Sequence, residues 1–308
     1  MSFTALLAKM FVLLCFLVIG VLCSRAGFAD EHTCGKLNKI VLNICAPAMV
    51  FSSVLNSEYA YQLKDILEFL LDSLAFNVLL IAIALGLSLL FCRKHPDRGT
   101  YRYMMAFGNC VFMGFPVVAA VCGNGAVFLG AIFSMPFNIL SFSVGIMMIG
   151  GSGRKRGGFW KMLLNPPFLA NIVAFLLFVF PVEAPESVKE VFSYLGNMVV
   201  PLSMILIGAS LSRIRLRELF SDWRVYAVCM GKLLVAPVLL HLALRLIVSD
   251  PLFLNVLTIC GVMPVATVSQ ILAAEYGGNP ALASKGVFLS TLCSLLTIPL
   301  LLSFLLAS

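Results

Sequence analysis

Two prolines inside long apolar runs are the residues of this chain with the clearest chemical consequence. Pro116 ends Met113-Gly-Phe-Pro116, Pro264 ends Gly261-Val-Met-Pro264, and each motif holds a glycine. A proline within a helix removes a backbone donor and clashes with the carbonyl group four residues earlier. Within lipid, the freed backbone groups need partners or must line a cavity. We therefore expect two broken helices whose second halves begin after the prolines.

The expected breaks predict the charge of a bound molecule. A half-helix that begins at mid-membrane presents unpaired N–H groups and about half a positive charge at its N-terminus. Two such ends that converge from opposite sides could together offset about one negative charge without a fixed cation. The pattern therefore predicts a small organic anion, such as a carboxylate, as the substrate.

Amide side chains close to prolines are the candidate substrate contacts. Asn109 precedes Pro116 by seven residues, about two helical turns, while Asn43 and Asn197 each precede a proline by four residues. An amide can donate hydrogen bonds to a carboxylate, or it can simply tie two helices together. With Pro116 and Pro264, we take these three amides as candidate substrate-binding residues. Weaker candidates of the same kind are Asn138, Ser141, Thr267 and Gln270.

Two charged residues lie inside apolar runs. Asp72 is either an intramembrane acid, which suggests a function by default, or a residue near the outer headgroups. Lys232 lies about two turns inside its run, from which its side chain could extend to the cytoplasmic interface. Both are candidates for ion coupling.

The composition requires these residues to be positioned by membrane helices. The chain has 308 residues, of which 61% are hydrophobic and 11% charged, whereas soluble domains carry about 25% charged residues. A span needs roughly 20 apolar residues. We predict ten helices, at 4–23, 37–56, 68–92, 103–122, 125–149, 163–181, 188–211, 223–248, 252–276 and 285–306.

Charge asymmetry orients these helices. With the N-terminus outside, inside segments hold sixteen cations, among them Arg93, Arg154 and Arg224, and outside segments hold Lys64, Lys189 and Arg245. Cytoplasmic loops are enriched in Lys and Arg. We predict a multi-pass protein of the cell membrane, plasma or bacterial inner, with both termini extracytoplasmic.

Matching landmarks indicate an internal repeat. The Asn-x-x-x-Pro pattern occurs at 43–47 and 197–201, and the glycine-proline landmarks follow in the same order in both halves. A duplicated unit of five helices inserts its second copy upside down, as in many secondary transporters. We predict an all-α polytopic protein with two inverted five-helix repeats, at 1–150 and 163–308, joined by a short cytoplasmic loop at 151–162. Helices 4 and 9 break at their prolines and cross.

Other classes of function have little support. The cations lie in short loops, which argues against nucleic acid despite the net charge of +7. The ten cysteines have no zinc-ligand spacing, the three histidines are scattered, and no intramembrane acid pair appears. We expect no catalytic residues, no metal and no cofactor. A receptor that binds without transporting remains an alternative.

The chain resembles the auxin efflux carrier family, whose bacterial members include malate and malonate permeases. The resemblance rests on Asn109-Cys-Val-Phe-Met-Gly-Phe-Pro116, on Pro264 followed by Glu275-Tyr276, on Asn165-Pro166 and on Leu206-Ile-Gly-Ala-Ser-Leu211. It implies ten helices with the fourth and ninth crossing, an elevator-like alternation between a scaffold and a moving bundle, and a homodimer. It also implies that Asn109 helps to hold a substrate carboxylate.

Two departures from the family pattern limit the substrate assignment. The plant carriers have a lysine four residues after the acid that Asp72 matches, whereas this chain has Phe76. The long cytoplasmic loop of the plant carriers is also absent. We therefore expect a secondary carrier or uniporter for an auxin-like anion or a mono- or dicarboxylate, with a sodium- or proton-coupled symporter as the nearest alternative.

Overall fold

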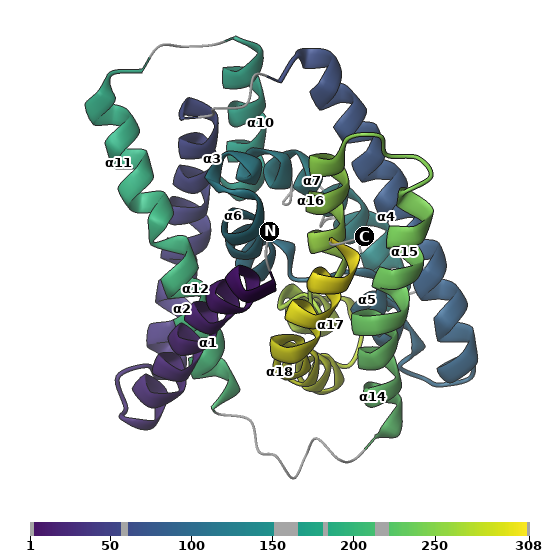
Figure 1. Ribbon diagram of the computed structural model, residues 1–308. Coiled ribbons are helices and arrows are strands. Elements are labelled where there is room, and N and C mark those ends of the chain that lie inside the picture. Colours follow the sequence, from purple (N-terminus) through teal and green to yellow (C-terminus); the bar gives the residue numbers. More distant parts are fainter. Residues whose placement is uncertain (1–2, 57–60, 151–165, 181–183, 213–221, 307–308) are drawn as a thin grey trace. The chain divides into compact units, whose positions relative to one another are not determined.

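The computed structural model describes residues 3–56, 61–150, 166–180, 184–212 and 222–306, and these form helices joined by short connections (Figure 1). Six helical segments are long and apolar enough to cross a membrane: Glu31–Leu55, Leu63–Phe91, Asn124–Gly150, Glu186–Ser210, Trp223–Leu244 and Pro280–Leu305. Four shorter apolar segments are Phe11–Arg25, Cys110–Cys122, Phe168–Val179 and Pro251–Gly261. Each of the ten predicted ranges overlaps one of these segments. The predicted loop 151–162 lies outside the described residues.

The chain divides into two compact units, each built from both halves of the sequence. Unit 1 comprises Met1–Phe69, Val111–Met135 and Leu163–Ile214, and unit 2 comprises Leu70–Cys110, Pro136–Met162 and Arg215–Ser308. The helices α4 (Leu63–Phe91) and α7 (Val127–Leu140) continue from one unit into the other.

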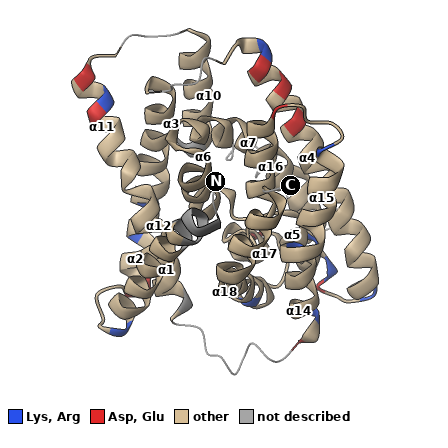
Figure 2. Cartoon of the chain, in the orientation of Figure 1, with Lys and Arg blue, Asp and Glu red and all other residues tan. Residues whose placement is uncertain are grey.

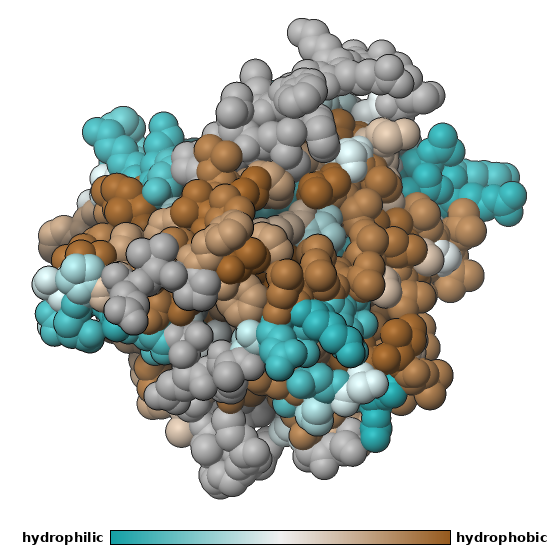
Figure 3. Space-filling model, turned by 90° about the horizontal axis from the view of Figure 1, so that it is seen from above, coloured by the Kyte–Doolittle hydropathy of each residue, from teal (hydrophilic) through white to brown (hydrophobic). Residues whose placement is uncertain are grey.

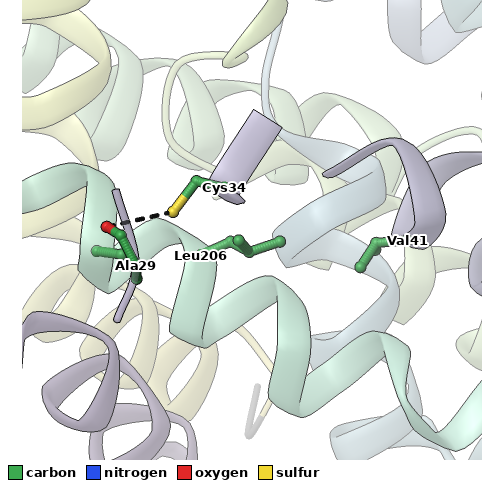
Figure 4. Close-up of a cluster of buried hydrophobic side chains, with 5 residues drawn as sticks. Ala29, Cys34, Val41 and Leu206 are labelled. Carbon is green, nitrogen blue, oxygen red and sulfur yellow. Dashed lines mark hydrogen bonds between the residues drawn. The ribbon is translucent and has the colours of Figure 1, made fainter. Parts of the chain in front are cut away.

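Unit 1 is held together by close helix packing. Its elements are α1 (Phe3–Arg25), α2 (Glu31–Ile40), the π-helix η1 (Val41–Cys45), α3 (Ala46–Leu55), α6 (Phe115–Cys122), the 3₁₀ turn η3 (Asn124–Ala126), α10 (Pro166–Val179), α11 (Glu186–Asn197) and α12 (Val199–Leu211). The helix α1 packs along α12, and α3 packs against α10 and α11. A buried cluster of Ala29, Cys34, Val41, Leu206 and Ala209 joins α2, η1 and α12 (Figure 4).

Two glycines allow the backbones of α1 and α12 to approach each other. A Cβ atom on Gly20 would lie 2.0 Å from the carbonyl oxygen of Ile205, and one on Gly208 would lie 2.0 Å from that of Leu17. Small residues at such contacts are the usual means of helix association in lipid. Only glycine fits at either position.

Unit 2 contains both helix breaks. Its elements, besides most of α4, are α5 (Arg98–Ala106), the π-helix η4 (Ser141–Gly145), α8 (Ile146–Gly150), α14 (Trp223–Met230), the π-helix η6 (Gly231–Val235), α15 (Ala236–Leu244), α16 (Pro251–Gly261), α17 (Val268–Tyr276) and α18 (Pro280–Leu305). The helix α18 packs against α5, α14, α16 and α17, and α8 packs against α5 and α17. The two half-helices α5 and α17 are therefore fixed by the same neighbours.

The surface is apolar over much of the face shown in Figure 3. On α4, Leu71, Leu74 and Val78 are exposed, whereas Phe76 and Leu80 on the other side of the helix are buried. Both faces of this helix are thus hydrophobic, which is typical of a helix with lipid on one side.

Charged residues gather at the ends of helices within each unit (Figure 2). In unit 1, Glu186 and Glu190 lie at the start of α11, and Lys36 and Lys39 lie on α2. In Figure 2, the acids of α11 and the lysines of α2 lie toward opposite ends of this unit. This distribution agrees with the asymmetry expected from the sequence.

Candidate functional site

Two broken helices pair with each other inside unit 2. The helix α5 ends at Ala106, α16 ends at Gly261, and an extended stretch follows each. Gly108 pairs antiparallel with Val265. The backbone amide of Asn109 donates to the Pro264 carbonyl at 2.7 Å, and the backbone amide of Ala266 donates to the Phe107 carbonyl at 3.1 Å. We call residues 107–109 and 264–266, which form this contact, the crossing.

The predicted position of one break was wrong. Pro264 lies in the extended stretch as predicted, but Pro116 lies in the first turn of α6, and the first break occurs at 107–109. Because the π-helix η2 (Cys110–Gly114) runs directly into α6, Pro116 lies inside the continuous helical segment Cys110–Cys122 rather than at a break. Gly108 makes the break possible, since a Cβ atom there would approach the Met263 carbonyl oxygen to 3.2 Å.

The backbone amides at the crossing are mostly paired within the protein. Besides the two bonds between the segments, the Val265 amide donates to the hydroxyl of Ser290 at 3.0 Å. The expectation that unpaired amides would themselves hold the anion therefore does not apply to Asn109, Val265 and Ala266. Side chains at the crossing remain as the donors for a bound molecule.

The Asn109 side chain is such a donor. Asn109 is 4% exposed, and its Nδ2 atom has no hydrogen-bond partner among the described residues. Leaving a buried donor unpaired costs about 1–3 kcal/mol. By contrast, the buried Asn77 in the same unit donates to the Ser73 carbonyl at 2.7 Å. Asn109 thus offers a hydrogen bond that the protein does not use.

π-Helices adjoin most of the predicted polar candidates. Asn43 lies in η1, Lys232 lies in η6, Asn138 comes just before η4, and Asn109 immediately precedes η2 (Cys110–Gly114). A π-helix shifts the hydrogen-bond register from i+4 to i+5, which re-aims side chains and is frequent at functional sites. The sequence carries no signal that we recognised for these segments.

The remaining candidates in unit 2 are less closely tied to the crossing. Thr267 and Asn138 are half-buried, and Gln270 is exposed. The Gln270 side-chain oxygen accepts a hydrogen bond from Ser284 at 2.9 Å, in an open groove of α17 and α18 that Glu275 also lines. Asp72 is buried at 8% exposure, which favours the intramembrane interpretation of this acid over the headgroup one.

Asn43, Asn197 and Pro116 lie in unit 1. Asn43 and Asn197 are exposed. Asn197 lines a small cavity of about 20 Å³ together with Ser52, Ser193 and other residues of α3, η3 and α11. Within that unit, the Ser52 and Ser193 hydroxyls lie 3.0 Å apart. Asn43 and Asn197 thus belong to unit 1, whereas the residues of the crossing belong to unit 2.

Lys232 occupies a place that the sequence did not predict. Its side chain is fully buried at 0% exposure, so it does not extend to an interface. A Cβ atom on Gly108 would lie 3.3 Å from the Lys232 Nζ atom, which therefore lies against the crossing.

A polar network joins the starts of three helices in unit 2. The Tyr101 hydroxyl donates to the Asp222 carboxylate, whose Oδ1 atom accepts from the Arg224 amide at 2.9 Å. Nearby, the Asn279 side chain donates to Asp97 at 3.1 Å, and its backbone amide donates to the Thr100 hydroxyl at 3.1 Å. The network fixes the start of α5 against the starts of α14 and α18.

The Asp222 contacts predict a pH-dependent contribution to stability. Burial alone would raise the pKa of Asp222, but the bonds from Tyr101 and Arg224 and the positive charge of Arg224 hold this pKa below its ordinary value. A lowered folded pKa stabilises the protein above the unfolded value, about 3.9, and this gain is lost as the pH falls through the folded value. In detergent, we expect Asp222→Asn to lower the melting temperature by about 2–4 °C at pH 7, for a loss near 1 kcal/mol. The difference from wild type should shrink as the pH falls below about 4 and disappear below the folded pKa, and an equal difference at pH 3 and pH 7 would contradict it.

Comparison with known proteins gives the family. A model of the membrane transport protein family matches residues 5–157 and 157–302. An uncharacterized transporter of Methanocaldococcus jannaschii is 27% identical over 304 residues, covering 94% of this chain and 95% of the relative. The uncharacterized transporter YfdV of Escherichia coli is 20% identical over 306 residues, covering 96% of each. The chain therefore belongs to the membrane transport protein family, that of the auxin efflux carriers, and is a multi-pass membrane transporter.

Proposed function

We propose that this protein is a secondary transporter of a small organic anion, auxin-like or a mono- or dicarboxylate, which binds at the crossing. The observation that carries the proposal is the buried side-chain amide of Asn109, which has no partner among the described residues and lies beside the paired breaks of two helices. Non-helical backbone at membrane depth is tolerated where it is buried in protein or lines a cavity. Transporters of inverted-repeat architecture bind their substrates at such broken helices.

The proposed architecture has ten membrane helices in two inverted repeats, 1–150 and 163–308, joined at 151–162. The correspondence of ten apolar segments with the ten predicted ranges supports it. We propose elevator-type alternating access, supported by the division of the chain into two compact units that each combine segments of both halves. By resemblance to the family, the protein would be a homodimer, with both termini on the extracytoplasmic side of the cell membrane.

A coupled symporter is the second candidate, because of Asp72. This acid is buried inside α4 in the same unit as the crossing, and intramembrane acids commonly take part in proton or ion relays. Export of a monoanion needs no coupling, since a potential negative inside favours exit by about 2.3 kcal/mol per 100 mV. Uptake would need a coupled cation, and Asp72→Asn should then abolish concentrative uptake while leaving exchange intact.

Flux into reconstituted vesicles tests the proposed function. We expect vesicles that contain the full chain to take up at least one labelled member of a panel of malate, malonate, acetate, benzoate, phenylacetate and indole acetate. The uptake should exceed that of empty vesicles at least tenfold. Dependence on an imposed sodium or proton gradient would identify the symporter. No flux above empty vesicles for any carboxylate of the panel would contradict the proposal.

A further inference from the structure

Lys232 is a buried charge in the middle of a membrane span. It lies nine residues after Trp223, where the span Trp223–Leu244 begins, or about 13 Å along the helix axis. It is the only Lys or Arg among the buried residues of the part of the chain described here. A lysine side chain near a span end normally extends to the interface, and this one does not.

The ammonium group has no partner among the described residues. The Lys232 Nζ atom makes no hydrogen bond to a described residue, and no described acid forms an ion pair with it. The thiols of Cys110 and Cys260 are electrostatic neighbours of this group. A buried charge is expensive unless it is paired and hydrogen-bonded.

The surroundings of Lys232 are those of the crossing. The Nζ atom lies against Gly108, whose missing side chain leaves room for it. The next residue is Asn109, whose side-chain amide also has no partner among the described residues. The backbone amides of Asn109, Val265 and Ala266 are already bonded. The crossing therefore has two side-chain donors that no described group accepts from, and a carboxylate could accept from both.

We propose that the Lys232 ammonium binds the carboxylate group of the substrate at the crossing and neutralises one negative charge during transport. This inference rests on the proposed function and names the group that distinguishes a charged substrate from a neutral one. Because Lys232 is the one buried cation of the described chain, a monocarboxylate is matched in charge, whereas a dicarboxylate leaves one negative charge uncompensated. We therefore expect the site to prefer monocarboxylates.

The test compares acids with their neutral amides on the purified full chain. The probes are acetate, benzoate, phenylacetate and indole acetate, each with its corresponding amide, and the readouts are binding and vesicle uptake. The variants are Lys232→Met, which keeps the length and removes the charge, and Lys232→Arg, which keeps the charge. Lys36→Met serves as the control, because Lys36 is an exposed cation on α2.

We expect wild type, Lys36→Met and Lys232→Arg to bind an acid of the panel in preference to its amide. Lys232→Met should bind that acid at least 30-fold more weakly and bind the amide unchanged. The unliganded Lys232→Met protein should melt at the same temperature as wild type or higher, since an unpaired buried charge has been removed. A residue with only a structural role would give the opposite change in melting temperature.

The outcomes separate the two proposals. Wild-type affinity for the acid in Lys232→Met, with wild-type flux, would overturn the role of Lys232 and leave the transport function standing. A destabilised Lys232→Met protein whose remaining folded fraction still prefers the acid would likewise overturn it. If wild type itself neither binds nor transports any acid of the panel, the proposed function fails first.

Discussion

Asn109→Ala is expected to reduce carboxylate flux by about 10- to 100-fold, while the protein stays folded. A hydrogen bond to a charged group contributes about 1.5–3 kcal/mol, and the Asn109 Nδ2 atom has no other described partner to lose. The effect should appear mainly as weaker binding, measured from the concentration dependence of vesicle uptake. Asn109→Asp, which has nearly the same shape, should reduce flux further because it places a negative charge beside the anion.

Asn77→Ala is the matched control for Asn109. Asn77 is a buried amide of the same unit, but its donor is already bonded within α4. We expect this variant to lose stability through the lost side-chain hydrogen bond to the Ser73 carbonyl group and to keep its apparent affinity for the carboxylate. Equal losses of affinity in the Asn77 and Asn109 variants would mean that neither amide contacts the substrate.

Gly208→Ala and Gly20→Ala are expected to have the largest effects on stability. A methyl group at either position would lie 2.0 Å from a backbone carbonyl oxygen of the opposite helix, so α1 and α12 would have to separate. Overpacking costs typically 1–3 kcal/mol and occasionally more. We expect a loss of about 3 kcal/mol, which corresponds to roughly 6–12 °C in the melting temperature.

Gly86→Ala is the control for this pair. It makes the same chemical change in α4, where nothing lies within 4 Å of the added Cβ atom. Because alanine favours the helix by up to about 1 kcal/mol over glycine, this variant should be as stable as wild type or slightly more stable. If all three variants had the same melting temperature, the close contact of α1 and α12 would be refuted.

The helices of this fold could be predicted from the sequence because a helix that crosses lipid needs a long run of mostly apolar residues. Runs such as 68–92 are largely apolar, and the structure places α4 at Leu63–Phe91. The site of the first break was harder to predict. Pro116 appeared to mark it, whereas the helix ends just before Gly108, where an added Cβ atom would lie 3.2 Å from the Met263 carbonyl oxygen. That approach is a tertiary property, and no local pattern records it.

The candidate site was predicted in part. Asn109 and Pro264 were identified from spacing, and the structure places both at the crossing. Asn43 and Asn197 had an equally regular spacing, yet both are exposed in unit 1. Spacing along one helix shows which residues share a face, but it does not show which face meets the other broken helix.

The position of the Lys232 side chain could not be predicted from the sequence. At two turns from the end of an apolar run, the sequence allows the side chain to reach an interface or to turn inward. The structure buries it against Gly108. The Lys232 ammonium group is therefore a second source of positive potential at the crossing, besides the N-termini of the half-helices. A fixed charge distinguishes an acid from its amide far more sharply than partial charges do.

The position of a bound carboxylate tests the central claim most directly. We suggest determining the structure of the full chain with a brominated analogue of whichever carboxylate gives the highest flux, and locating the bromine by anomalous scattering. We predict one site for the analogue, in contact with residues 107–109 and 264–266, with the carboxylate within hydrogen-bond distance of Asn109 Nδ2. A bound analogue only in the groove of α17 and α18, or only in the cavity beside Asn197, would contradict it.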